Sequence, residues 1–133
     1  HGMTRQAKED IMPSQSMSRS YNRKEVIARE GEAGVGWFVL LEGKVGVFKH
    51  DVEIAAYDQR GMVLGELSGI LNKPRTASLV ALEPTKIVFI DSGLDQLIVE
   101  HPDITKKILV NLAERLAKTT DDLITAVQKD AQG

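Results

Sequence analysis

The hydrophobic pattern of this sequence changes near residue 91, and this change constrains the fold more than any other feature. Before it, short segments rich in Val, Ile, Leu, Phe and Tyr alternate with turns in which glycine is frequent. Short strands joined by glycine-containing turns are typical of antiparallel sandwiches and jelly rolls. We therefore expect a mainly β domain with a hairpin tip at His50-Asp51 and strands near 17–21, 25–29, 36–41, 44–49, 52–57, 77–82 and 85–91.

Two helices are expected after the last strand. Ser92 is placed to cap a short helix around Leu97, and Pro102 suits the first position of a longer one. At 1.5 Å per residue, a helix from Pro102 to about Lys129 would extend roughly 40 Å, which is more than a small sandwich needs as cover. Its apolar stripe predicts a homodimer through the 109–126 face, unless the whole stripe packs on the helix's own sheets. The stripe consists of Leu109, Leu112, Leu116, Thr119, Leu123 and Ala126.

Length and composition limit the function classes. The chain of 133 residues has the size of one domain, its formal net charge is −2, and it contains no cysteine. Such a charge draws the chain neither to nucleic acid nor to anionic membrane, and no run approaches the roughly 18 apolar residues of a membrane span. We expect a cytoplasmic domain with no metal, no membrane contact and no nucleic-acid contact of its own.

The chain is expected to divide into three parts. Residues 1–16 would be a polar tail. It opens with His1-Gly2, which resembles the remnant of an expression tag. Residues 17–91 would form the β domain and residues 92–130 the C-terminal helices. An enzyme is not expected, because the sequence has no Gly-x-Ser-x-Gly elbow and no histidine cluster with metal-ligand spacing.

One stretch, residues 64–77, brings together the groups of an anion site. It contains a Gly65-Glu66-Leu67 turn, a short apolar helix and a Pro74-Arg75-Thr76-Ala77 return into a strand. Backbone N–H groups at a helix start and a guanidinium bind phosphate, and a carboxylate accepts a sugar hydroxyl. On composition alone, Arg75 would be a surface residue at a loop end and Glu66 a favourable charge in a first helical turn.

At this spacing the stretch resembles the phosphate-binding cassette of the cyclic nucleotide-binding domain family. From about Arg23 to Lys129 the chain is most similar to the sensor domain of the catabolite activator branch of bacterial regulators. The resemblance implies an antiparallel β-roll with a short phosphate-binding helix and a long C-terminal dimerisation helix. It also implies ligand contacts at Gly65, Glu66, Leu67, Arg75, Thr76 and Ala77.

Within that resemblance, Arg75 would bind the cyclic phosphate together with the N–H groups of Glu66 and Leu67, and the Glu66 carboxylate would accept the ribose 2′-hydroxyl. The cassette departs from the family pattern at Ser68-Gly69, where many members carry a small and a bulky apolar residue. Because glycine in a helix costs about 1 kcal/mol relative to alanine, a loose short helix is expected.

The resemblance leaves the base open between adenine and guanine. In the activator branch a Thr-Ser pair on the long helix reaches adenine from both subunits, and Thr119 and Thr120 stand at those positions. Thr76, directly after the arginine, resembles domains that bind cyclic GMP. We expect cyclic AMP, with cyclic GMP as the alternative, and Ile54 as a further apolar wall. The expected base pocket consists of Val47, Leu64, Arg115, Thr119 and Thr120.

The expected function is a cyclic nucleotide sensor that signals by repositioning its C-terminal helix. Two alternatives remain at this level. One is an interaction and dimerisation module that keeps the fold without a ligand. The other is the sensory half of a DNA-binding regulator, although no helix-turn-helix fits between the long helix and Gly133.

Overall fold

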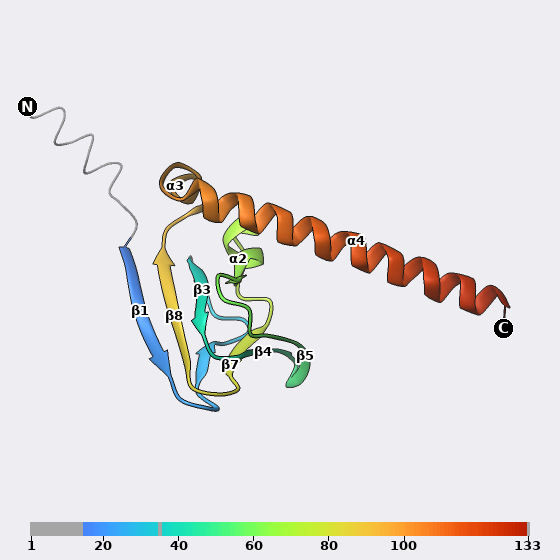
Figure 1. Cartoon of the computed structure of the whole chain (residues 1–133), viewed down its shortest axis with the longest axis horizontal. Coiled ribbons are helices and arrows are strands. Elements are labelled where there is room, and N and C mark those ends of the chain that lie inside the picture. Colours follow the sequence, from blue (N-terminus) through green and yellow to red (C-terminus); the bar gives the residue numbers. More distant parts are fainter. Residues whose placement is uncertain (1–14, 35, 133) are drawn as a thin grey trace, which may run out of the picture.

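The computed structural model describes residues 15–34 and 36–132, and its strands form two four-stranded antiparallel sheets (Figure 1). One sheet has the order β1-β8-β3-β6 and the other β2-β7-β4-β5. The expected antiparallel β-roll with C-terminal helices is confirmed. The elements are β1 (Gln15–Tyr21), β2 (Val26–Ala28), β3 (Trp37–Glu42), β4 (Val45–Lys49), β5 (Val52–Tyr57), β6 (Val63–Leu64), α2 (Glu66–Leu71), β7 (Ser78–Ala81), β8 (Thr85–Asp91), α3 (Leu94–Glu100) and α4 (Pro102–Gln132).

The expected strands are all present, and the hairpin tip between β4 and β5 lies at His50-Asp51. Both tip residues have positive φ, 50° and 64°, as a tight hairpin turn with the twist of its strands requires. The sequence pattern missed β6, which has only two residues and is defined by pairing with β3 rather than by periodicity. Of the expected tail, residues 1–14 lie outside the described residues, and the division at 16 and 91 stays a prediction.

The expected cap of α3 was wrong. Gly93 occupies the N-cap position without a side-chain hydrogen bond. Ser92 is buried instead, and its carbonyl oxygen accepts a 3.0 Å hydrogen bond from the Trp37 indole. The residue is therefore used to anchor the indole at the end of β8 rather than to start the helix.

Alternating residues of β3 supply two separate apolar clusters. Phe38 and Leu40 point between the two sheets, whereas Trp37 points to the opposite face of the first sheet, because successive side chains of a strand face opposite ways. The cluster between the sheets contains Ala28, Phe38, Leu40, Val45, Leu64, Leu79 and Ile87. The cluster beneath the C-terminal helices contains Trp37, Val63, Ile90, Leu97 and Ile108.

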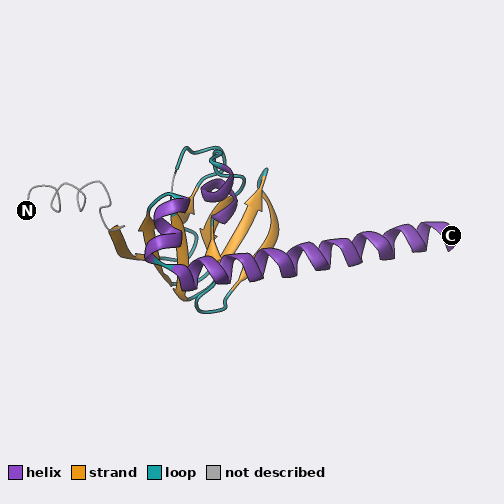
Figure 2. Cartoon of the chain, turned by 90° about the horizontal axis from the view of Figure 1, so that it is seen from above, coloured by secondary structure: helices purple, strands orange, loops and turns teal. Residues whose placement is uncertain are grey.

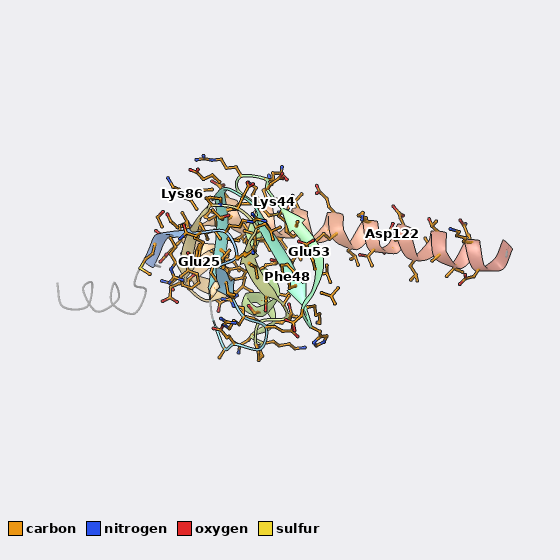
Figure 3. The ribbon with its side chains drawn as sticks, turned by 90° about the horizontal axis from the view of Figure 1, so that it is seen from below. Glu25, Lys44, Phe48, Glu53, Lys86 and Asp122 are labelled. Carbon is orange, nitrogen blue, oxygen red and sulfur yellow. The ribbon has the colours of Figure 1, made fainter. Side chains whose placement is uncertain are left out.

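Helix α4 crosses the roll with its first part and extends well beyond it with the rest (Figures 1 and 2). Ile108 is only 3% exposed because it packs into the cluster around Trp37. Further along, Leu116 and Leu123 are 68% and 64% exposed. In Figure 3, Asp122 lies on the part of α4 that extends beyond the β-roll. The apolar stripe of the helix is therefore covered only near its start.

Within the described residues, no helix combines the length and the apolar character needed to cross a membrane.

Candidate functional site

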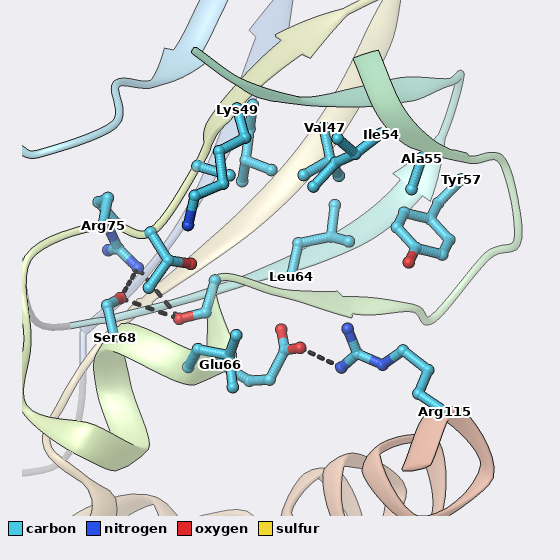
Figure 4. A pocket seen from close by; sticks show the side chains of 15 residues that line it. Val47, Lys49, Ile54, Ala55, Tyr57, Leu64, Glu66, Ser68, Arg75 and Arg115 are labelled. Atoms are coloured by element: carbon cyan, nitrogen blue, oxygen red, sulfur yellow. Dashed lines mark hydrogen bonds and ion pairs between the residues drawn. The ribbon is translucent and has the colours of Figure 1, made fainter. Parts of the chain in front are cut away.

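A pocket of about 330 Å³ lies between the second sheet, α2 and α4 (Figure 4). Its volume falls in the range of small-molecule sites. Strands β4, β5 and β7 contribute to one wall, and the end of β6, the start of α2, the segment before β7 and one residue of α4 form the rest. The lining residues are Val47, Lys49, Ile54, Ala55, Tyr57, Leu64, Gly65, Glu66, Leu67, Ser68, Arg75, Thr76, Ala77, Leu79 and Arg115.

Nearly all of the residues singled out in the sequence meet at this pocket. The six expected ligand contacts line it, as do Val47, Leu64 and Arg115 from the expected base pocket. Thr119 and Thr120 do not line it, because α4 has by then passed the roll. The Thr120 hydroxyl donates to the carbonyl of Leu116, one turn back in its own helix. Within one chain, the two threonines therefore lie outside the pocket.

Arg75 is a buried cation whose hydrogen-bond partners are neutral. The residue is 7% exposed, and its Nη1 donates to the Ser68 hydroxyl at 2.6 Å and to the carbonyl oxygens of Gly65 and Gly36 at 3.2 and 3.4 Å. Its guanidinium also stands over the Phe38 ring, 5.0 Å from the centroid. No carboxylate of the described residues forms an ion pair with it.

The electrostatics of Arg75 follow from this burial. Desolvation lowers the pKa of the guanidinium, and the charge of Glu32 has the opposite, smaller effect of raising it. An arginine stays protonated in proteins even so. The pocket therefore contains a fixed positive charge that is only partly compensated, which is the requirement for binding an anion.

Gly65 allows the close approach on which this arrangement depends. Its φ is +78°, a left-handed conformation that glycine adopts without strain. A Cβ at this position would stand 2.7 Å from Nη1 of Arg75 and 3.2 Å from the Phe38 ring. The guanidinium can therefore reach the backbone at the start of α2 only because residue 65 has no side chain.

Glu66 joins the short helix to the long one. It is 5% exposed, and its Oε1 accepts a hydrogen bond and ion pair from Nη2 of Arg115, which lies on α4. Burial acts to lower the pKa of Arg115, but the hydrogen bond and charge of Glu66, with a smaller part from Tyr57, raise it overall. The contact links the pocket floor to the helix that leaves the roll.

The Ser68-Gly69 departure in α2 has a packing explanation. The Ser68 hydroxyl accepts from Arg75 and donates to the Gly65 carbonyl at 3.1 Å. A Cβ at Gly69 would stand 2.7 to 3.0 Å from three ring carbons of Trp37, which is completely buried. Ser68 thus positions Arg75, and Gly69 leaves room for the indole of Trp37. The sequence alone predicted only a loose helix here.

Sequence reasoning missed Lys49, Ala55, Tyr57, Ser68 and Leu79 as lining residues. Ala55 and its neighbour Ile54 both face the pocket because the β4–β5 pairing shifts register between Val47 and Phe48. Such a bulge interrupts the alternation of side chains between the two faces of the sheet, so the two-residue period in the sequence does not predict which residues face the pocket. Ser68 was visible as a departure from the family pattern, and that departure was the one available signal.

Comparisons with known proteins point to one family. A family model described as "Cyclic nucleotide-binding domain" matches residues 18–101. Lysophospholipase NTE1 of Pyricularia oryzae is 31% identical over 114 residues, which are 82% of this chain and 8% of that protein. The CRP-like cAMP-activated global transcriptional regulator of Mycobacterium tuberculosis is 28% identical over 123 residues, 85% of this chain and 53% of that protein. The chain therefore spans about half or less of these relatives.

A solved structure described as "Sp-2Cl-cAMPS bound to PKAR CBD2" is 31% identical to the chain with a TM-score of 0.63. The similarity covers 81% of this chain and 71% of that one.

Proposed function

The chain belongs to the cyclic nucleotide-binding domain family, and from that premise we propose that its pocket binds cyclic AMP in preference to cyclic GMP and that α4 reports the occupancy. The observation that carries the proposal is the buried Arg75 guanidinium, which faces a pocket of about 330 Å³ and whose hydrogen-bond partners in the described part of the chain are all neutral. A cyclic phosphate supplies the single negative charge that such a site lacks.

The proposed ligand contacts divide between two ends of the pocket floor. Arg75 and the backbone N–H groups of Glu66 and Leu67 bind the cyclic phosphate, with the Thr76 hydroxyl beside them. The ribose 2′-hydroxyl donates to the Glu66 carboxylate, which has a second oxygen besides the one that accepts from Arg115. Ala77 and Gly65 leave space for the phosphate and sugar, because neither carries a bulky side chain.

The base lies against the apolar wall of β4 and β5, where Val47 and Ile54 line the pocket opposite Leu64. Similarity to a cAMP-activated regulator and to a structure with bound Sp-2Cl-cAMPS supports adenine, whereas similarity to a cGMP-dependent protein kinase of Eimeria tenella keeps guanine as the alternative. Thr119 and Thr120 do not line the pocket of their own chain, so in a dimer it is the threonines of the second copy that we propose contact the base.

Signalling would pass through the Glu66–Arg115 contact. A nucleotide that binds the Glu66 carboxylate changes the balance of interactions that attach α4 to α2, and binding free energy is thereby coupled to helix orientation. The domain is then a regulatory module without catalysis of its own. A cytoplasmic location, and the absence of direct contact with nucleic acid or membrane, stay predictions.

A second candidate is favoured by the exposed apolar residues of α4, among them Leu116 and Leu123. These residues would form a homodimer along the 109–126 face whether or not a nucleotide is bound. In that case the domain would be a constitutive interaction module. As a further possibility, the chain would be the sensory half of a DNA-binding regulator, as its similarity to half of the Mycobacterium tuberculosis protein allows.

The test is isothermal titration calorimetry with cyclic AMP and cyclic GMP. The protein is first unfolded, dialysed and refolded, so that nucleotide carried over from expression is removed. Saturable binding of one nucleotide per chain supports the sensor, and the tighter ligand identifies the base. Absence of heat and of competition from a folded protein would leave the dimerisation module as the better account.

A further inference from the structure

Lys49 ends β4 and faces the pocket. Side chains alternate along a strand, so Val45, Val47 and Lys49 lie on the same face of β4. Val45 is fully buried in the core and Val47 lines the pocket, and the next residue on this face is the lysine, which also lines it. A lysine therefore occupies the position on this face of β4 where the apolar series of Val45 and Val47 would place another apolar residue.

The sheet register brings this lysine to the phosphate-binding end of the pocket. Strand β4 pairs with β7 so that Val47 lies opposite Leu79 and Phe48 opposite Ser78. The next residue of β4, Lys49, therefore lies at the segment before β7, which contains Arg75 and Ala77. Figure 4 shows the Lys49 ammonium directed towards the Arg75 side, whereas Tyr57 and Arg115 lie at the opposite side.

The charges around the pocket are unbalanced at this end. Its charged lining residues are Lys49, Arg75, Arg115 and Glu66, which is three cations and one carboxylate. Glu66 is already paired with Arg115. Among the described residues, neither Lys49 nor Arg75 has a carboxylate at ion-pair distance. Glu32 acts on Arg75 only from beyond ion-pair distance, so two cations that share one end of the pocket favour binding an anion between them.

We propose that Lys49 is a second cationic contact for the cyclic phosphate, opposite the buried Arg75. The inference rests on the proposed function and adds a residue to it. Arg75 is almost fully buried and hydrogen-bonded to Ser68, so it fixes the orientation of the phosphate. Lys49 is exposed, so it contributes a charge that solvent salt screens. The alternative is that the lysine stem merely covers the apolar wall while its ammonium stays in water.

The experiment measures the affinity of the refolded protein for cyclic AMP and cyclic GMP by calorimetry, in low and in high salt. The variant is Lys49→Met, which keeps the length of the side chain and removes its charge. In low salt we expect a loss of about fivefold for both nucleotides, because both carry the same phosphate. The loss should shrink in high salt, and Lys49→Arg should restore most of the affinity.

The matched control is Lys44→Met. Lys44 is exposed just before the start of β4, outside the pocket lining (Figure 3), so its loss should leave the affinity unchanged. Equal affinities of Lys49→Met and the unsubstituted protein would overturn the inference while leaving the proposed function intact. A loss confined to cyclic GMP would also overturn it, because it would indicate a contact to the guanine acceptor atoms. If the unsubstituted protein binds neither nucleotide, the proposed function and this inference both fail.

Discussion

The Arg75 guanidinium donates a 2.6 Å hydrogen bond to the Ser68 hydroxyl, which in turn donates to the carbonyl of Gly65. Ser68 belongs to α2 and Gly65 is its N-cap, whereas the third partner, the carbonyl of Gly36, precedes β3, and the arginine itself lies just before β7. These hydrogen bonds hold the buried guanidinium charge in place with neutral groups. The end of the pocket that we propose binds the phosphate is therefore held in shape by hydrogen bonds within the protein, which lowers the cost of ordering it on binding.

Ser68→Ala should weaken binding of cyclic AMP about threefold to tenfold, because the guanidinium loses its shortest hydrogen bond and part of its fixed orientation. Calorimetry on the refolded protein measures the change. Ser18→Ala, at an exposed position of β1, is the control and should have no effect. An unchanged affinity of the Ser68 variant would show that the arginine is held well enough by the backbone carbonyls alone.

Arg75→Ala should weaken nucleotide binding by at least about tenfold, because a charge-assisted hydrogen bond contributes about 1.5–3 kcal/mol. Arg75→Lys should restore little, since an ammonium cannot reproduce the planar fork of the guanidinium. Arg29→Ala is the matched control, because Arg29 is exposed and lies outside the pocket lining. Circular dichroism of each variant verifies the fold, and retained affinity in a folded Arg75→Ala protein would contradict the site assignment.

Gly69→Ala should destabilise the fold by about 1–3 kcal/mol, although alanine is the better helix former by about 1 kcal/mol. The added methyl group would lie 2.7 Å from the Trp37 ring, which is completely buried and has nowhere to move. Urea unfolding measures the free energy of unfolding. Gly93→Ala is the control, because a Cβ there meets nothing within 4 Å. A stabilised Gly69 variant would mean that helix propensity outweighs the packing of the indole.

Leu116→Glu combined with Leu123→Glu should convert a dimer to a monomer, because two charges would be placed in the apolar stripe of α4 that the roll leaves uncovered. Sedimentation velocity over a range of concentrations measures the change. Val99→Glu on α3 is the control, an equally exposed apolar residue away from the stripe. If the unsubstituted protein is monomeric at every concentration, the dimer proposal and the role of Thr119 from a second copy both fail.

The strands were predictable because each is encoded locally, by apolar residues and by the turns that separate them. The cassette was predictable for a related reason, since Gly65, Glu66 and Arg75 lie within eleven residues of one another in the chain. Val63–Leu64 could not be found this way, because two residues have no period and become a strand only through pairing with β3.

The length of α4 was also predictable from the sequence. Which part of its apolar stripe the β-roll leaves exposed was not. Ile108 and Leu116 belong to the same helix and are both apolar, yet the first is buried and the second is 68% exposed. The difference depends on where α4 leaves the roll, which is set by its packing against β6 and Trp37.

By itself, the sequence determined the fold class, the cassette and the identity of its charged groups, because those depend on residue types at short separations. Only the tertiary structure decided that Lys49 and Arg75 line the same pocket, that Arg115 pairs with Glu66, and that Gly69 leaves room for the indole of Trp37 from β3. Each of these contacts joins residues far apart in the chain. They depend on strand register and helix packing, which no local pattern of residues encodes.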